Sequence, residues 1–235
     1  MPQARIDPSG APAPTADAGG SDAYGRRPTW RGWLHFAAFL AVIPAGAYLL
    51  SAAQPAASRA AVAVYWASLA GLFATSASYH RLARSPTSVK WFRRADHSMI
   101  YVLIAGTYTP ICLLVLPAIW GIPMLVVIWV AALAGIAMKM VRLGTDTSGS
   151  GSGSWLYIVM GWAAVVSLPV LVTHLDGVQL GLLAAGGVLY TLGAVVLGRH
   201  RPDPFPDTFG YHEVWHAMTI VAGACHFALI ATMVL

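Results

Sequence analysis

Long runs of apolar residues, separated by short polar connections, dominate the chain from residue 33 onward. A helix rises about 1.5 Å per residue, so about 20 apolar residues are needed to cross a hydrocarbon core about 30 Å thick. Lipid offers the backbone no hydrogen-bond partner, and a helix is therefore the expected form of each crossing. Seven segments meet this length, at about 33–53, 60–80, 97–116, 119–138, 155–173, 178–198 and 212–235.

The boundary between the third and fourth segments is the least distinct, because no charged side chain lies in residues 98–137. We place the break at Pro117, where Trp120, Gly121 and a second proline indicate a turn. With this division the sequence predicts an all-α membrane protein, built as a seven-helix transmembrane bundle over residues 32–235.

The composition agrees with a membrane protein and excludes several other classes. Of the 235 residues, 57% are hydrophobic and only 10% are charged, which excludes a chain that is disordered throughout. Two cysteines are too few for a disulfide scaffold, and the 14 basic residues form no dense patch with interleaved aromatics, so no nucleic-acid partner is expected. Residues 1–31 contain no apolar run and are predicted to be a disordered tail, and residues 144–154 have the composition of a flexible linker.

The distribution of basic residues orients the predicted bundle. Thirteen of the 14 lie in the N-terminal tail or in the second, fourth and sixth connections, and only Arg59 lies on the other side. Because Lys and Arg are enriched on the cytoplasmic side of membrane proteins, we expect a cytoplasmic N-terminus and a C-terminus outside. A miscounted helix would scramble this asymmetry, so it also supports seven spans.

Ionisable side chains gather at the cytoplasmic ends of three predicted helices. His80 closes the second segment, Asp96 and His97 open the third, and His212 and His216 open the last. Such groups are costly in or near a membrane and are therefore candidates for function. His212 and His216 are four residues apart, which places both imidazoles on one helix face about one turn from each other.

These residues predict a zinc site. His80, His212 and His216 would form a three-histidine site with its fourth position open to water, the arrangement by which catalytic zinc lowers the pKa of that water. Asp96 could hydrogen-bond the water or orient an imidazole. The alternative is that the histidines cap helix ends at the membrane interface. An i, i+4 pair with a third histidine at the same depth favours zinc over that alternative.

The sequence HEVWH at 212–216 also matches the H-E-x-x-H pattern of zinc metalloproteases, in which Glu213 would be the general base. Two wildcards in a short pattern make this weak evidence. The extended form of the pattern fails because Ala222 stands where a further histidine would be needed. His226 lies about 15 Å along a continuous helix from the second histidine, too far for the same metal, and is expected to be a buried packing or hydrogen-bonded residue.

The stretches around these residues resemble the haemolysin III group, the bacterial branch of the progestin and adiponectin receptor superfamily. The resemblance covers roughly residues 33–235, and the motifs occur in the family's order from the second predicted helix to the last. The motifs are SASYH at 76–80, RRADHSMIYVLIAGTYTP at 93–110, MGW at 160–162 and FGYHEVWHAMTIVAGACHF at 209–227.

This resemblance implies a seven-helix bundle with a cytoplasmic N-terminus in a bacterial plasma membrane, with membrane lipids as its partners. In adiponectin receptors one histidine of the second helix and two of the seventh bind a zinc ion near the cytoplasmic side. The corresponding ligands in this chain are His80, His212 and His216. Ser76, one turn before the first ligand, and Asp96, near the zinc-bound water, are the implied catalytic residues. The receptors have Gln where this chain has Glu213, which favours Asp96 as the partner of the water.

Other residues are given supporting roles. Tyr108 is expected either to support the site or to hydrogen-bond between helices, which is the commoner role of polar side chains in bundles. His35 lies outside the motifs. Six glycines are expected to let helices approach closely, namely Gly106, Gly135, Gly161, Gly186, Gly187 and Gly193.

Two functions are consistent with these features. The first is a zinc-dependent hydrolase of a lipid amide or ester, similar to the ceramidase activity attributed to adiponectin receptors. The second is a non-enzymatic membrane protein, either receptor-like with structural zinc or a pore-forming cytolysin, as the family name suggests. A pore predicts a continuous polar stripe along several helices, whereas the polar groups of this sequence cluster at one end of the bundle.

Overall fold

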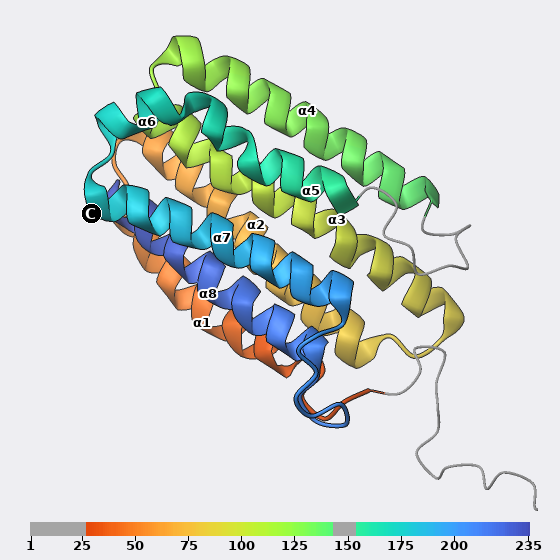
Figure 1. Ribbon diagram of the computed structural model, residues 1–235. Helices are drawn as coiled ribbons and strands as arrows, with labels where there is room; N and C mark the ends of the chain where they lie inside the picture. The colour runs from red at the N-terminus through yellow and green to blue at the C-terminus, as the bar shows by residue number, and fades with distance from the viewer. Residues whose placement is uncertain (1–26, 143–153) are drawn as a thin grey trace, which may run out of the picture.

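The computed structural model describes residues 27–142 and 154–235; the tail before residue 27 and nearly all of the predicted linker at 144–154 lie outside that part. In these described residues, seven helical spans are long and apolar enough to cross a membrane, which confirms the predicted seven-helix bundle. The helices lie alongside one another in Figure 1. The elements are α1 (Trp33–Ala52), α2 (Ala56–Leu82), α3 (Pro86–Pro110), η1 (Ile111–Val115), α4 (Ala118–Arg142), α5 (Ser154–Gly161), η2 (Trp162–Ser167), α6 (Leu168–His174), α7 (Gly177–Arg199) and α8 (Tyr211–Thr232).

The third span begins much earlier than predicted. α3 starts at Pro86 and not at residue 97. Ser85 caps it by accepting a hydrogen bond from the N–H of Ser88, and Pro86 occupies the first turn, where its missing N–H costs nothing. A search for apolar runs detects only the part of a helix that lies in lipid, and the first turns of α3 are polar and basic. Asp96 and His97 therefore lie inside α3 and do not open it.

The predicted break at Pro117 is confirmed. α3 continues into the π-helical turn η1, and Leu116 is extended before α4 begins. The Pro117 carbonyl accepts hydrogen bonds from the N–H groups of Trp120 at 2.8 Å and Gly121 at 2.9 Å. These bonds start α4 directly after the turn.

The fifth crossing is not one regular helix, because α5 passes into the 3₁₀ stretch η2 before α6 completes the span. A 3₁₀ stretch changes which backbone groups are paired along the helix. The hydroxyl of Tyr108 on α3 donates to the Gly161 carbonyl at 3.0 Å and accepts from the Ala164 N–H at 2.7 Å. Of its two expected roles, Tyr108 therefore takes the hydrogen bond between helices.

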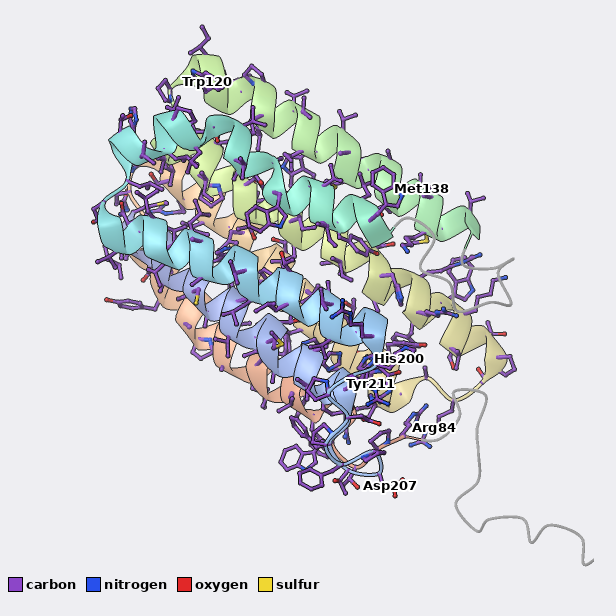
Figure 2. The ribbon with its side chains drawn as sticks, viewed as in Figure 1. Arg84, Trp120, Met138, His200, Asp207 and Tyr211 are labelled. Carbon is purple, nitrogen blue, oxygen red and sulfur yellow. The ribbon has the colours of Figure 1, made fainter. Side chains whose placement is uncertain are left out.

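Three helices, α2, α3 and α8, are the most buried of the spans. α2 packs against α1 and α3, α8 packs against α7, and α1 contacts α8, so the first and last helices meet (Figure 1). We call the end at which α2 finishes and α8 begins the histidine end of the bundle. Figure 2 shows Arg84, His200, Asp207 and Tyr211 at this end, with Trp120 at the opposite one.

Four of the six glycines lie where two helices approach closely. A Cβ atom added at Gly106, Gly135, Gly186 or Gly193 would come within about 3.1 Å of a side chain on another helix. Gly161 and Gly187 have nothing within 4 Å of that position, so the predicted role is wrong for these two. Among the described residues, no neighbour packs against the side on which their Cβ atoms would lie.

The adjacent residues Gly186 and Gly187 of α7 allow a matched test of this packing. In Gly186→Ala the new Cβ would lie 2.3 Å from Nε2 of the buried His226 ring, which contacts the Leu183 carbonyl at 3.3 Å. We expect Gly186→Ala to destabilise the fold by about 1–3 kcal/mol, because the ring must move. Gly187→Ala should leave stability unchanged or raise it, since Ala favours a helix by about 1 kcal/mol over Gly. Thermal unfolding in detergent compares them, and equal shifts would contradict the packing.

Candidate metal centre

Three histidines meet at the histidine end. His80 lies in the last turn of α2, and His212 and His216 lie in the first two turns of α8. One ring nitrogen from each can be chosen so that all three atoms lie within 4.8 Å of one another. His80 and His216 are buried, and His212 is partly buried. The structure thus brings together the three residues predicted as ligands.

The geometry of these nitrogens fits a metal ion. The Nε2 atoms of His80 and His212 lie 3.2 Å apart. Two nitrogens bound to tetrahedral zinc at about 2.0–2.1 Å would lie about 3.3 Å apart. Neither ring nitrogen of His216 has a hydrogen-bond partner among the described residues, although both are buried. Such an atom is costly to leave without a partner, and an ion between the three rings would satisfy one of them.

Helix capping at the interface fits this arrangement poorly. A histidine that caps a helix end bonds a backbone carbonyl or faces water. Here the three imidazoles face one another instead, with ring centroids 4.6 Å apart for the α8 pair and 4.8 and 5.0 Å from His80 to its two partners.

Asp96 and Ser76, the residues predicted to be catalytic, lie together near this group. Ser76 is one turn before His80 on α2, and its side chain lies beside the Asp96 carboxylate of α3. Both residues are buried. Nδ1 of His97 lies 3.8 Å from an Asp96 oxygen and bonds the Arg93 carbonyl at 2.8 Å. Asp96 does not belong to the group of residues whose ligand atoms lie within 4.8 Å of one another, so it is not placed as a ligand.

Glu213, the base of the metalloprotease pattern, is engaged elsewhere. Its side chain is fully buried, and Oε1 accepts a hydrogen bond from Nε of Arg31 at 2.5 Å. Oε2 accepts the N–H of Gly210 at 2.9 Å, which is part of the cap of α8. One oxygen thus holds the start of α8 and the other holds the segment before α1. Glu213 is therefore not free to act as the general base that the protease pattern requires.

His35 is a member of this site that the sequence interpretation missed. It lies in the first turn of α1, and its ring stacks on that of His216 with centroids 3.8 Å apart and planes at 16°. The motifs gave no reason to include it. One signal was present, because the predicted orientation places the start of the first helix on the same side of the membrane as His80 and His212.

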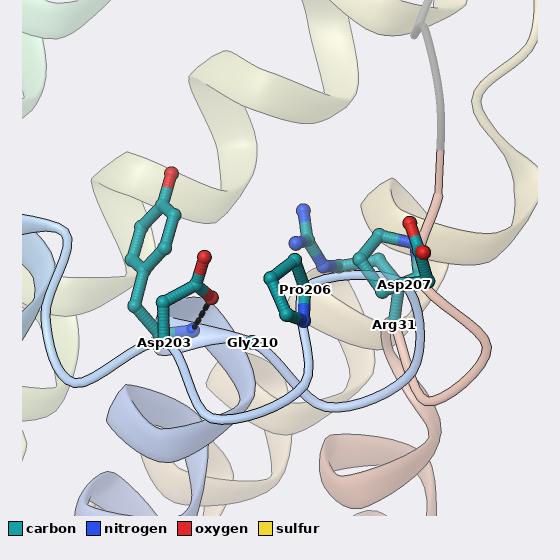
Figure 3. A pocket seen from close by; sticks show the side chains of 7 residues that line it. Arg31, Asp203, Pro206, Asp207 and Gly210 are labelled. Carbon is teal, nitrogen blue, oxygen red and sulfur yellow. Dashed lines mark hydrogen bonds between the residues drawn. The ribbon is translucent and has the colours of Figure 1, made fainter.

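The segment before α1 packs on the loop before α8. The N–H groups of Thr29 and Trp30 donate to loop carbonyls at 3.1 Å each, so residues 28–31 are held in place, in contrast to the disordered tail predicted over 1–31. A cavity of about 280 Å³ lies between the two segments, and no histidine of the metal group lines it (Figure 3). Its lining consists of Pro28, Arg31, Asp203, Pro206, Asp207, Gly210 and Tyr211.

A comparison with known protein families covers all of these residues. The family model described as haemolysin-III related matches residues 24–227. This chain belongs to the haemolysin III family. The part that matches the haemolysin III model extends from before Arg31 to beyond His226, and therefore includes every residue of the site described above.

Two haemolysin III proteins are similar to the chain over most of their own length. It is 35% identical to Hemolysin-3 of Bacillus cereus over 175 residues, which are 74% of this chain and 75% of that protein. It is 32% identical to the Hemolysin-3 homolog of Bacillus subtilis (strain 168) over 164 residues, which are 70% and 72% of the two chains. The resemblance seen in the motifs is thereby confirmed, and with seven apolar spans the chain is a multi-pass membrane protein of the haemolysin III family.

Proposed function

We propose that this haemolysin III protein is a zinc-dependent hydrolase of a lipid amide or ester, with its site at the histidine end of the bundle. The observation that supports this most directly is the group of three histidines with ring nitrogens within 4.8 Å of one another. Asp96, which lies beside Ser76 one turn before His80, supplies a buried carboxylate at the same end of the bundle. A three-histidine metal site beside a carboxylate is an arrangement that supports hydrolysis.

The residues of the chain divide this chemistry among them. When bound, zinc polarises a carbonyl oxygen and lowers the pKa of a water molecule in an open fourth position. His80, His212 and His216 would hold the ion as neutral imidazoles. Asp96 would take a proton from the attacking water and pass it to the leaving amine or alcohol, so that the hydroxyl joins the acyl carbon as the C–N or C–O bond breaks. Ser76 would help to hold the carboxylate in place by donating its hydroxyl to it.

The position of the site favours a lipid substrate. The three histidines belong to α2 and α8, which both span the membrane, and they lie near the ends of those helices. An acyl chain can lie along the apolar outer side of the bundle, while the carbonyl group of the lipid reaches the depth of the helix ends. The orientation predicted from the basic residues would place this chemistry at the cytoplasmic leaflet of a bacterial plasma membrane.

A hydrolysis assay tests the proposal. Purified protein with zinc should release fatty acid from at least one member of a panel of ceramides and phospholipids in mixed micelles. Release should stop when a chelator removes the metal and return when zinc is added back, because the ion supplies most of the electrostatic stabilisation of the reaction. Release that persists without metal would contradict the proposal, as would the absence of release from every lipid by zinc-loaded protein.

A second candidate function is a pore-forming cytolysin, favoured by the name Hemolysin-3 of the two relatives. A pore needs a continuous polar path through the bundle. Among the described residues, the buried hydroxyls of Ser68 on α2 and of Thr107 and Thr109 in the last turn of α3 bond carbonyls of their own helix, which leaves less polarity to line such a path. Recordings across a planar bilayer distinguish the candidates, because stepwise ion conductance by pure protein would favour the pore over the hydrolase.

A further inference from the structure

His35 is the most closely packed aromatic neighbour of the metal group outside the three proposed ligands. It is 2% exposed, and its ring lies nearly parallel to that of His216 at a centroid distance of 3.8 Å. On another side it meets Phe73 of α2, with centroids 5.1 Å apart and planes tilted by 50°. Both nitrogens of His35 lack a hydrogen-bond partner among the described residues. The contact it makes with His216 is thus one of ring faces.

No described protein group bonds His216 in the way that usually fixes a metal-binding histidine. Such a ring almost always donates its second N–H to a carboxylate, a backbone carbonyl or water, and this bond sets the orientation of the ring. In the described part of the chain, neither nitrogen of His216 has a protein partner of this kind. Rotamer preferences cannot fix the ring in place of such a hydrogen bond, because the distribution of the histidine χ2 angle is broad. A packing contact against the ring is another way to hold its plane.

The other rings around His216 do not lie face to face with it. His80 is tilted by 57°, His212 stands at 69° and Trp215 is tilted by 48°. His35, at 16°, is the one described ring that covers a face of the imidazole. The His216 ring cannot turn without colliding with the His35 ring stacked on its face, because protein interiors are closely packed.

We propose that His35 is a positioning residue, whose flat ring fixes the orientation of the His216 imidazole toward the metal. The inference rests on the proposed metal site, and it assigns the role to the planar face of His35 and not to its nitrogens. A phenylalanine has a ring of similar shape without nitrogens, and can therefore replace it. A residue without a ring cannot.

The start of α1 is anchored in a way that keeps His35 in register with the ligands. Gly32 has a left-handed backbone with φ of 80°, and a Cβ there would lie 2.9 Å from the Cβ of His80, so the chain passes directly against the first ligand. Arg31 is bound to Glu213 between the two α8 ligands, and the Arg81 guanidinium lies 3.5 Å from the Trp33 ring centroid. These contacts tie α1 to both helices that carry the histidines.

Zinc affinity measured by competition with a chromogenic chelator tests the inference on full-length protein in detergent. We expect His35→Phe to bind zinc within about threefold of the unaltered protein, and His35→Ala to bind it about 10–100-fold more weakly, the usual loss when a supporting residue is removed. The visible spectrum of protein loaded with Co²⁺ gives a second readout, since the bands should be kept in His35→Phe and altered in His35→Ala. His174→Ala, at the exposed end of α6, is the matched control and should match the unaltered protein.

Three results would overturn the inference. Equal weakening by phenylalanine and alanine would show that a nitrogen of His35 is needed, as a ligand or a hydrogen-bond partner. Full affinity in both variants would show that the stack does nothing for the metal. Failure of the unaltered protein to bind zinc would reject the metal site itself, and is distinguishable because it appears without any mutation. If His35→Ala does not fold, His35→Leu fills the space without a flat ring and gives the same comparison.

Discussion

Replacement of both His212 and His216 by alanine is expected to abolish zinc binding, whereas the unaltered protein should carry about one zinc ion per chain. The two residues lie on adjacent turns of α8. They supply two of the three ring nitrogens that lie within 4.8 Å of one another. His80 alone cannot hold the ion, because a single imidazole leaves the rest of the coordination shell to water. Elemental analysis of the protein after purification in detergent measures the metal directly.

His226→Ala is the matched control for this double variant. His226 is also a buried histidine of α8, but its ring bonds the Leu183 carbonyl and packs against Gly186 of α7, away from the metal group. The control should keep its zinc, so a loss in the double variant would not be a general effect of removing histidine from α8. Zinc retained by the double variant, with helical content unchanged in circular dichroism, would contradict the assignment of these ligands.

The seven spans could be predicted because the membrane imposes one length and one backbone form on each of them. The same criterion could not find the start of α3. Its first turns, from Pro86 to the residues before Asp96, are polar and basic and lie beyond the apolar run. The signal for that start was of another kind, a serine followed by proline, which caps a helix regardless of the membrane.

The metal group could be predicted in part from spacing. His212 and His216 share a helix face because they are four residues apart, and His80 joined them only through the predicted arrangement of helix ends. No spacing predicts that His35 stacks on His216, because that contact depends on α1 meeting α8 as the bundle closes. The bond from Arg31 to Glu213 has the same origin, and it explains why a stretch with the composition of a tail is held in place.

Two carboxylates at the histidine end, those of Glu213 and Asp96, are distinguished by what they bind. Glu213 has one oxygen on the guanidinium of Arg31 and the other on the N–H of Gly210, so its contacts are those of an anchor. Asp96 has the side chain of Ser76 as its close partner, and Ser76 is on the helix face of His80. Of these two described carboxylates, Asp96 is therefore the one whose neighbour, Ser76, shares a helix face with a proposed ligand and could hold it ready to accept a proton.

Asp96→Asn is accordingly expected to lower lipid hydrolysis by about 10²–10⁴-fold, the usual contribution of a general base, while zinc binding stays within a few fold. Asn has nearly the same shape and can still bond Ser76, but its amide cannot accept the proton. Glu213→Gln is the matched control, and should keep hydrolysis within a few fold because it still presents an acceptor to Gly210. Initial rates and zinc content are measured on the same preparations. A loss of activity in Glu213→Gln with full activity in Asp96→Asn would exchange the two roles, because the proton would then be accepted by the carboxylate of HEVWH and not by the one paired with Ser76.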